Sequence, residues 1–182
     1  MRSLLLKNLM RAPVTEPAPH DDKLAALGAE IAGVIGRQLG RSFTIRQVDA
    51  GSCNACELEI HALNNAYYDL ERFGIRFVAS PRHADALLVT GPVTHNMREA
   101  LLRTYAATPA PKWVIAAGDC AAGCGVFTGS YACVGAVANV VPVDLVIRGC
   151  PPMPTELLQG LLHLLTAPPV RQTAPADGRR PG

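Results

Sequence analysis

The chain has 182 residues, of which 49% are hydrophobic and 18% are charged, and its formal net charge is +2. This length predicts one globular domain with short tails, and the hydrophobic fraction is large enough to form a core. A net charge so close to zero, without a dense block of Lys and Arg, excludes the electrostatic footprint of a nucleic-acid-binding protein.

Neither end of the chain nor its interior predicts a membrane-spanning or secreted protein. Residues Met1–Arg11 combine a short apolar patch with basic residues, but lack a sustained apolar core and a small-residue cleavage site. The longest uncharged stretch, Cys120–Val143, is weakly apolar and interrupted by glycines. We therefore expect a cytoplasmic chain that is peripheral to a membrane or linked to one through partners.

Predicted helices and strands alternate along the chain. Residues 1–20 are expected to form an extended N-terminal arm, 21–165 a single domain, and 166–182, rich in Pro, Ala and Gly, a disordered tail. Within the domain, hydrophobic periodicity and turn residues predict helices over 21–38, 57–65, 94–106 and 155–165, and strands over 42–48, 75–79, 86–90, 113–117 and 143–147. Residues 131–138 are interpreted as the start of a further helix.

The strand–helix alternation, with nearly continuous apolar strands, predicts a parallel sheet covered by helices. Three cysteine-bearing loops directly follow strands of that sheet, at Cys53, Cys120 and Cys150. Loops beyond the carboxyl ends of parallel strands meet at one edge of an open α/β sheet. Thiols that are far apart in the sequence are therefore expected to meet there.

The chain contains six cysteines. In a cytoplasmic protein, metal ligation or redox chemistry is a better explanation for them than a disulfide framework. A cubane iron–sulfur cluster takes four thiolate ligands, and the C-x-x-C pair of Cys53 and Cys56 supplies two of them. The other two come from Cys120, Cys124, Cys133 and Cys150.

Local sequence favours Cys120 and Cys150 as the remaining ligands. Gly118 and Gly149 lie close before them and permit a close approach of the backbone. Cys124 competes with Cys120, whereas Cys133 is expected to have a buried structural role. Two alternatives stay open from spacing alone: a zinc site, which usually takes two close cysteine pairs, and a thioredoxin-like redox pair, which leaves the other cysteines unused.

Five ordered segments then resemble one known family. They are GSCNACELEI (51–60), SPRHADALLVTGPVT (80–94), GDC (118–120), GSYACVGA (129–136) and VPVDLVIRGCPPMPTEL (141–157). They are similar to the small subunits of [NiFe] hydrogenases and to the homologous B subunit of respiratory complex I. The segment LLKNLMRAPVTEPAP (5–19) is also similar to energy-converting hydrogenases and formate hydrogenlyases.

The resemblance implies a flavodoxin-like fold that carries one [4Fe–4S] cluster at the carboxyl edge of the strands. Carried over by position, the ligands are Cys53, Cys56, Cys120 and Cys150, and Glu59 matches a family glutamate beside the cluster. The complex I subunits carry two adjacent cysteines at the first motif, whereas here two residues separate Cys53 from Cys56. This spacing favours the hydrogenase branch.

The implied function is electron transfer between the nickel–iron centre of a separate large subunit and a ferredoxin-like iron–sulfur subunit, in a complex with membrane subunits on the cytoplasmic face. A complex I-like subunit that passes electrons to quinone is the alternative, and a zinc-stabilised assembly protein is a further one. Two structural expectations accompany this interpretation: Arg82 and Asp85 form a polar pair, and Tyr131 is a packed aromatic residue.

Overall fold

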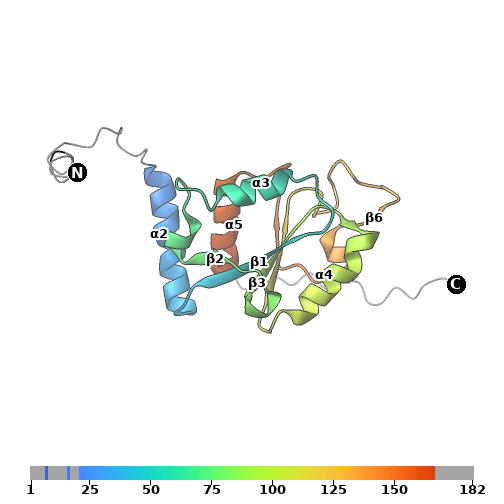
Figure 1. The fold of residues 1–182 in the computed structure, drawn as a ribbon, viewed down its shortest axis with the longest axis horizontal. Coiled ribbons are helices and arrows are strands. Elements are labelled where there is room, and N and C mark those ends of the chain that lie inside the picture. The colour runs from blue at the N-terminus through green and yellow to red at the C-terminus, as the bar shows by residue number, and fades with distance from the viewer. Residues whose placement is uncertain (1–6, 8–15, 17–20, 167–182) are drawn as a thin grey trace.

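A computed structural model of the chain describes residues 21–166, together with Lys7 and Glu16 (Figure 1). The rest of the predicted N-terminal arm (1–20) and of the predicted tail (166–182) lies outside the described residues, so both remain predictions. Within the part of the chain that is described, no helix is both long and apolar enough to cross a bilayer.

Five parallel strands form the central sheet, in the order β2-β1-β3-β5-β7. Their bounds are β1 Phe43–Asp49, β2 Ile75–Phe77, β3 Ala86–Thr90, β5 Trp113–Ala117 and β7 Leu145–Ile147. Renumbered along the chain within this sheet, the order is 2-1-3-4-5, which is that of flavodoxin-like folds. The predicted open parallel α/β architecture is therefore confirmed, with its topological switch point between β1 and β3.

The strands follow the apolar pattern of the sequence. β3 is buried along its whole length, as expected for a strand covered on both faces. In β1 the side chains alternate, so that Phe43 and Ile45 enter one hydrophobic core and Val48 enters the other. The sheet thus separates two cores.

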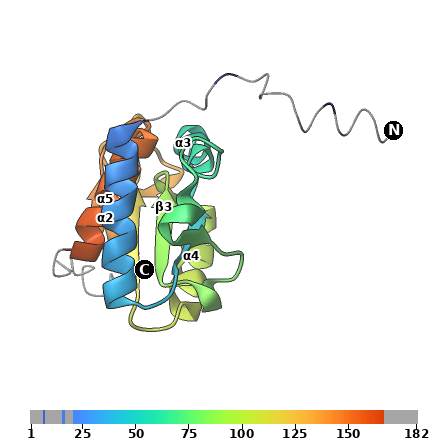
Figure 2. The ribbon, with the colours of Figure 1, turned by 90° about the vertical axis from the view of Figure 1, so that its left-hand side faces the viewer.

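Three helices cover one face of the sheet: α2 (Asp22–Gln38), α3 (Ala55–Ala62) and α5 (Pro154–Thr166). α2 begins where the side chain of Asp21 accepts hydrogen bonds from the backbone N–H groups of Lys23 and Leu24. Its buried face packs against α5, and the two helices run side by side on the same side of the sheet (Figure 2). A short 3₁₀ helix, η1 (Leu70–Phe73), completes this layer.

The other face is covered by α4 (His95–Ala107) and by η3 (Val137–Asn139). Thr94 caps α4, because its hydroxyl accepts a hydrogen bond from the Met97 N–H at 3.3 Å. Beside α4, strands β4 (Val93–Thr94) and β6 (Cys133–Gly135) pair in a small antiparallel sheet that the sequence did not predict.

The predicted helix over 131–138 is wrong, since this segment contains β6 and then η3. Gly135 has a φ of +105°, which a right-handed helix excludes, and it pairs with Val93 across the small sheet. Cys133 in β6 is half-buried rather than buried. Tyr131 is 97% exposed, so its expected role as a packed aromatic residue is wrong as well.

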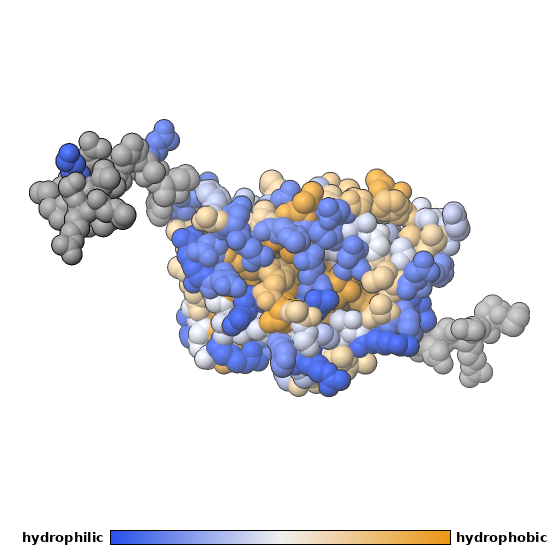
Figure 3. Space-filling view, viewed as in Figure 1, coloured by the Kyte–Doolittle hydropathy of each residue, from blue (hydrophilic) through white to orange (hydrophobic). Residues whose placement is uncertain are grey.

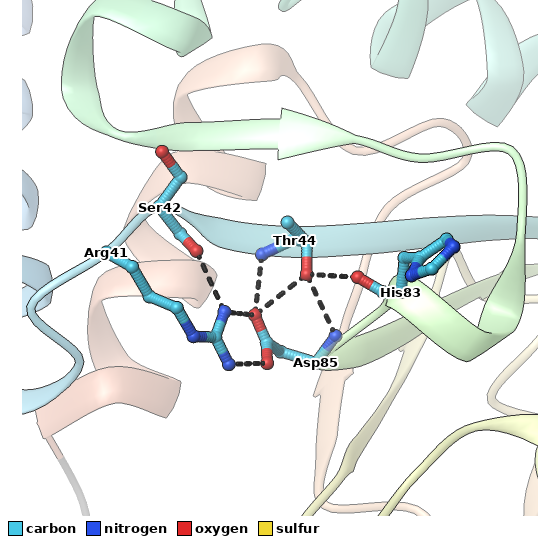
Figure 4. A network of polar contacts seen from close by, with 5 residues as sticks. All are labelled: Arg41, Ser42, Thr44, His83 and Asp85. Atoms are coloured by element: carbon cyan, nitrogen blue, oxygen red, sulfur yellow. Dashed lines mark hydrogen bonds and ion pairs between the residues drawn. The ribbon is translucent and has the colours of Figure 1, made fainter.

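The amino ends of the strands are joined by polar side chains (Figure 4). Asp85 accepts two hydrogen bonds from the Arg41 guanidinium, at 2.8 and 2.6 Å, and one from the Thr44 N–H at 2.9 Å. The expected pair between Arg82 and Asp85 is therefore wrong, because Arg41 occupies the place of the partner. Asp85 directly precedes β3, and its partners Arg41 and Thr44 lie just before and within the neighbouring strand β1.

Candidate metal centre

Four cysteines from three separate loops line one pocket at the carboxyl edge of the sheet. Cys53 and Cys56 follow β1, Cys120 follows β5, and Cys150 follows β7. The pocket is completed by residues of the same loops and of the turn after β3: Ser52, Ala55, Gly91, Asp119, Gly149 and Pro151. These loops and α3 lie at the upper margin of the molecule in Figure 1. The structure thus brings together the four residues predicted as ligands.

The loop between β1 and α3 is shaped by local hydrogen bonds. The Asp49 carboxylate accepts from the N–H groups of Gly51 and Ser52, both at 2.8 Å, which turns the chain at the end of β1. The Ser52 hydroxyl then accepts from the Asn54 N–H at 3.0 Å. Asn54 adopts a left-handed conformation with φ 72°, and α3 starts at the next residue. Cys56 therefore lies in the first turn of α3.

The loops after β5 and β7 are tied together. The Asp119 N–H donates to the Gly149 carbonyl oxygen at 2.8 Å, and the Gly149 N–H donates to the Asp119 carboxylate at 3.2 Å. Cys120 and Cys150 each follow one member of this pair directly in the sequence. The reciprocal contact therefore fixes the positions of two cysteines that are separated in the chain by strands β6 and β7.

Two glycines leave room beside the thiols. A Cβ atom on Gly118 would lie 2.6 Å from the Cys56 sulfur, and the residue has a φ of +93°. A Cβ atom on Gly125 would lie 2.2 Å from the Cys120 sulfur. Both contacts are far shorter than van der Waals separation, so any larger residue would displace a thiol. The space around Cys56 and Cys120 therefore depends on the absence of a side chain at these two positions.

The environment of Cys56 disfavours a free thiolate. Burial, followed by the nearby charges of Glu57, Cys53, Cys120 and Cys150, raises the pKa of the Cys56 thiol to about 12. At neutral pH this thiol is protonated unless a cation compensates for the clustered negative charge. Thiolate ligands release their protons when a metal binds, so a set of close thiols fits a cationic metal centre.

Cys120 lies in a similar environment with one difference. Burial raises the pKa of its thiol, but backbone N–H groups of Phe127 and Val126 donate toward the sulfur and oppose that increase. Backbone N–H donors to ligand sulfurs are a general feature of iron–sulfur sites, where they stabilise the added negative charge. The donor set around Cys120 therefore fits a cluster ligand.

Cys124 and Cys133 are not among the residues that line the pocket, although Cys124 contacts one of those residues, Asp119. Cys124 is exposed, and its sulfur contacts the Arg148 guanidinium and the carbonyl oxygen of Asp119. Cys133 belongs to β6. This arrangement agrees with the ranking that favoured Cys120 and Cys150 over these two residues, while the ligand roles themselves remain predictions.

Over residues 21–166, no group of three or more His, Cys, Asp and Glu side chains forms a site for a metal ion.

Glu57 also lies at this site, although sequence reasoning ranked it below Glu59. It is 5% exposed, whereas Glu59, which the resemblance put forward, is half-buried. The Ser52 hydroxyl donates to one Glu57 carboxylate oxygen at 2.5 Å. A signal was present in the sequence, because Glu57 lies three residues before buried Ile60 and residues so spaced share a helix face.

Comparison with known proteins gives consistent matches. The family model of the NADH ubiquinone oxidoreductase 20 Kd subunit matches residues 53–164, a range that includes all four pocket cysteines. Formate hydrogenlyase subunit 7 of Escherichia coli is 42% identical over 149 residues, which are 82% of this chain and 57% of that protein. The chain therefore aligns with little more than half the length of this relative.

A probable membrane-bound hydrogenase subunit of Pyrococcus furiosus is 47% identical over 127 residues, covering 70% of this chain and 76% of that protein. Among solved structures, a chain of the membrane-bound sulfane sulfur reductase, an archaeal respiratory membrane complex, has a TM-score of 0.62 and 34% identity, covering 75% of this chain and 74% of the other. The predicted resemblance is confirmed: this chain belongs to the family of the NADH ubiquinone oxidoreductase 20 Kd subunit.

Proposed function

We propose that this chain is the electron-transferring subunit of a membrane-associated [NiFe] hydrogenase and that it holds one [4Fe–4S] cluster. The four ligands in this proposal are Cys53, Cys56, Cys120 and Cys150. The observation that carries it is the pocket that these residues line together, although they come from three loops up to 97 positions apart, from 53 to 150. When bound, such a cluster is a carrier of single electrons.

The residues of this chain have separate roles in the proposal. The loop from Asp49 to Asn54 holds the C-x-x-C pair, and the Asp119–Gly149 contact holds the other two cysteines. Gly118 keeps the space beside the Cys56 sulfur clear. Backbone N–H groups directed at Cys120 stabilise negative charge on its sulfur.

The hydrogenase assignment rests on the names of the relatives and on one local feature. Two of the relatives are named as subunits of formate hydrogenlyase and of a membrane-bound hydrogenase. Here Asn54 and Ala55 separate the first two cysteines, as in the hydrogenase branch. The family name itself favours a second candidate, a complex I-like subunit that passes electrons to quinone.

The pocket edge also carries apolar side chains that fit a partner subunit. Large exposed apolar residues lie in the segments that follow the cysteines: Leu58, Val126, Phe127, Tyr131 and Met153. Apolar surface is visible along the upper margin in Figure 3, on the side of α3. We infer that a large subunit with the nickel–iron site covers this edge, because large exposed apolar side chains are typical of protein interfaces. A ferredoxin-like subunit and membrane subunits complete the proposed complex. In this proposal the chain lies on the cytoplasmic face of the membrane.

The test is made on the complex purified without oxygen, from wild type and from Cys53→Ala, Cys56→Ala, Cys120→Ala and Cys150→Ala variants. Iron and sulfide contents and the EPR spectrum of the reduced state are measured in each. We expect each of these variants to lose one [4Fe–4S] signal. Cys124→Ala is the matched control, since it removes a free thiol that does not line the pocket. We expect this variant to keep the signal.

The alternatives give different results. A wild-type complex that contains zinc and no reducible cluster contradicts the proposal and supports an assembly role. A reducible cluster together with quinone reduction, and without hydrogen turnover, supports the complex I-like function. Loss of the signal in Cys124→Ala but not in Cys120→Ala corrects the ligand set and leaves the function in place.

A further inference from the structure

Glu57 is a buried carboxylate directly beside a predicted cluster ligand. It follows Cys56 in the first turn of α3 and is 5% exposed. Glu is almost never fully buried unless it is paired with another group. One carboxylate oxygen accepts the hydrogen bond from Ser52, but the other, Oε1, is buried and has no partner among the described residues.

The hydrogen bonds of Ser52 define the role of Glu57 as an acceptor. The Ser52 oxygen accepts from the Asn54 N–H, so its own single proton is free to be donated to Glu57. A carboxylate is an acceptor only, which fits this arrangement. The same contact fastens Glu57 to the loop that carries Cys53 and Cys56, so the carboxylate keeps a fixed position relative to both.

No cation within the described residues neutralises Glu57. The ion pairs formed between described residues are Arg41 with Asp85 and Arg103 with Glu99, and both lie away from the cysteine pocket. A buried charge that lacks a counter-ion acts strongly on its neighbours, because little solvent screens it.

We propose that Glu57 is a positioning residue that lowers the reduction potential of the metal centre held by Cys56. This inference rests on the proposed cluster. Reduction of a cluster adds one electron and therefore one negative charge beside a carboxylate that is already buried there. Net charge and hydrogen bonding around a cluster set its potential, so an adjacent fixed negative charge makes the added electron less favourable.

Glu59 provides a matched comparison within the same helix. It carries the same charge only two positions away, but it is half-buried. Solvent and salt screen an exposed charge far more than a buried one. The proposal therefore requires the effect of Glu57 on the potential to exceed that of Glu59 and to persist at high ionic strength.

The experiment is an EPR-monitored redox titration of the purified complex with dithionite and redox mediators. The variants are Glu57→Gln, Glu57→Met, Glu57→Asp and Glu59→Gln, and iron and sulfide contents are measured for each. Glu57→Met removes the charge without introducing a buried amide. It is the second neutral variant, used if the amide of Glu57→Gln disturbs packing. Glu57→Asp keeps the charge.

We expect both neutral variants at position 57 to raise the midpoint potential of one cluster, and Glu57→Asp to stay nearer to wild type. Glu59→Gln is expected to cause a smaller shift that declines as salt is added. Equal midpoints in wild type and in cluster-loaded Glu57→Gln or Glu57→Met overturn the inference, as does a larger shift in Glu59→Gln. A wild-type complex without a cluster instead contradicts the proposed function, and the iron count separates the two cases.

Discussion

The two ends of the central sheet use polar groups in opposite ways. At the amino end, Asp85 and Asp144 each precede a strand, and each carboxylate accepts a hydrogen bond from a backbone N–H of a neighbouring strand. The donor to Asp85 is Thr44, at 2.9 Å, and the donor to Asp144 is Val114, at 2.8 Å. At the carboxyl end, four thiols gather in one pocket and a buried Glu57 oxygen has no partner among the described residues.

The two ends of the sheet differ in whether their polar groups find partners within this chain. Buried polar groups stabilise a structure when all of their hydrogen bonds are made, and unpaired ones cost free energy. The amino end satisfies its carboxylates with groups of this chain, so it needs nothing else. The carboxyl end collects two thiols, Cys56 and Cys120, whose raised pKa values favour the protonated form, so that their thiolates are favourable only beside a positive charge.

The largest expected effect concerns the carboxyl end. Gly118→Ala places a Cβ atom 2.6 Å from the Cys56 sulfur at a residue whose φ is +93°. We expect the purified complex to lose the iron, the sulfide and the EPR signal of one [4Fe–4S] cluster, because Cys56 is displaced. The left-handed conformation alone costs a non-glycine residue about 1–2 kcal/mol.

Gly36→Ala is the control for this substitution, since Gly36 lies in the last turn of α2 and nothing lies within 4 Å of the added Cβ atom. It is expected to keep full iron content and to stabilise the chain by about 0.5–1 kcal/mol, as a glycine-to-alanine change inside a helix does. Full iron content in Gly118→Ala would show that the pocket tolerates a methyl group and would contradict the tight site described here.

A smaller effect is expected at the amino end. Asp85→Asn weakens the charge-assisted bonds from Arg41 and Thr44 and should lower the free energy of unfolding by about 2 kcal/mol, measured by urea denaturation of the chain. The exposed Arg82, which sequence reasoning assigned as the partner, is the control. Arg82→Ala should change the free energy of unfolding by less than about 0.5 kcal/mol. A larger loss would mean that Arg82 also interacts with Asp85.

The same carboxylate predicts a pH dependence. Burial acts to raise the pKa of Asp85, but hydrogen bonds from Arg41 and Thr44 outweigh it and lower the pKa below 3.8. A depressed pKa in the folded state contributes stability above the pKa of the unfolded chain, and that contribution is lost as the pH falls through the folded value. The stability difference between wild type and Asp85→Asn should therefore be constant near neutral pH and shrink below about pH 4. A difference that grows at low pH would reverse the sign assigned here.

The smallest effect is expected for an ion pair that belongs to neither end. Glu99 and Arg103 form an exposed i,i+4 pair at 2.8 Å on α4. Glu99→Gln should lower the unfolding free energy by only about 0.3–0.5 kcal/mol, and added salt should remove the difference. A loss as large as that of Asp85→Asn would mean that burial is not what distinguishes the amino-end network.

Much of the fold was predictable because it follows from local periodicity. The apolar runs at β3 and β5 are long enough to identify buried strands, and the Asp21 cap marks the start of α2. The β4–β6 sheet was not predictable, because two- and three-residue strands leave no periodic pattern. Their pairing depends on residues about 40 positions apart.

The candidate site divides in the same way. The C-x-x-C pair and the position of cysteines after strands were readable in the sequence, and topology was enough to place them on one edge. The spacing of Glu57 from Ile60 was a signal for Glu57, but it could not by itself decide between Glu57 and Glu59, since both lie on one short helix and carry the same charge. Burial decides between them, and it depends on how α3 packs against the rest of the chain.

The sequence by itself determined the parallel sheet and the meeting of cysteine-bearing loops at its carboxyl edge, because both depend on short patterns and on simple rules of chain connection. Local sequence favoured Cys120 and Cys150 but left Cys124 as a competitor, and the resemblance to the family selected the full set. Only the tertiary structure decided that Arg41 rather than Arg82 pairs with Asp85, and that Glu57 rather than Glu59 is buried beside Cys56. Such pairings are set by distances between segments remote in the sequence, and the free energy of a buried charge depends on those distances.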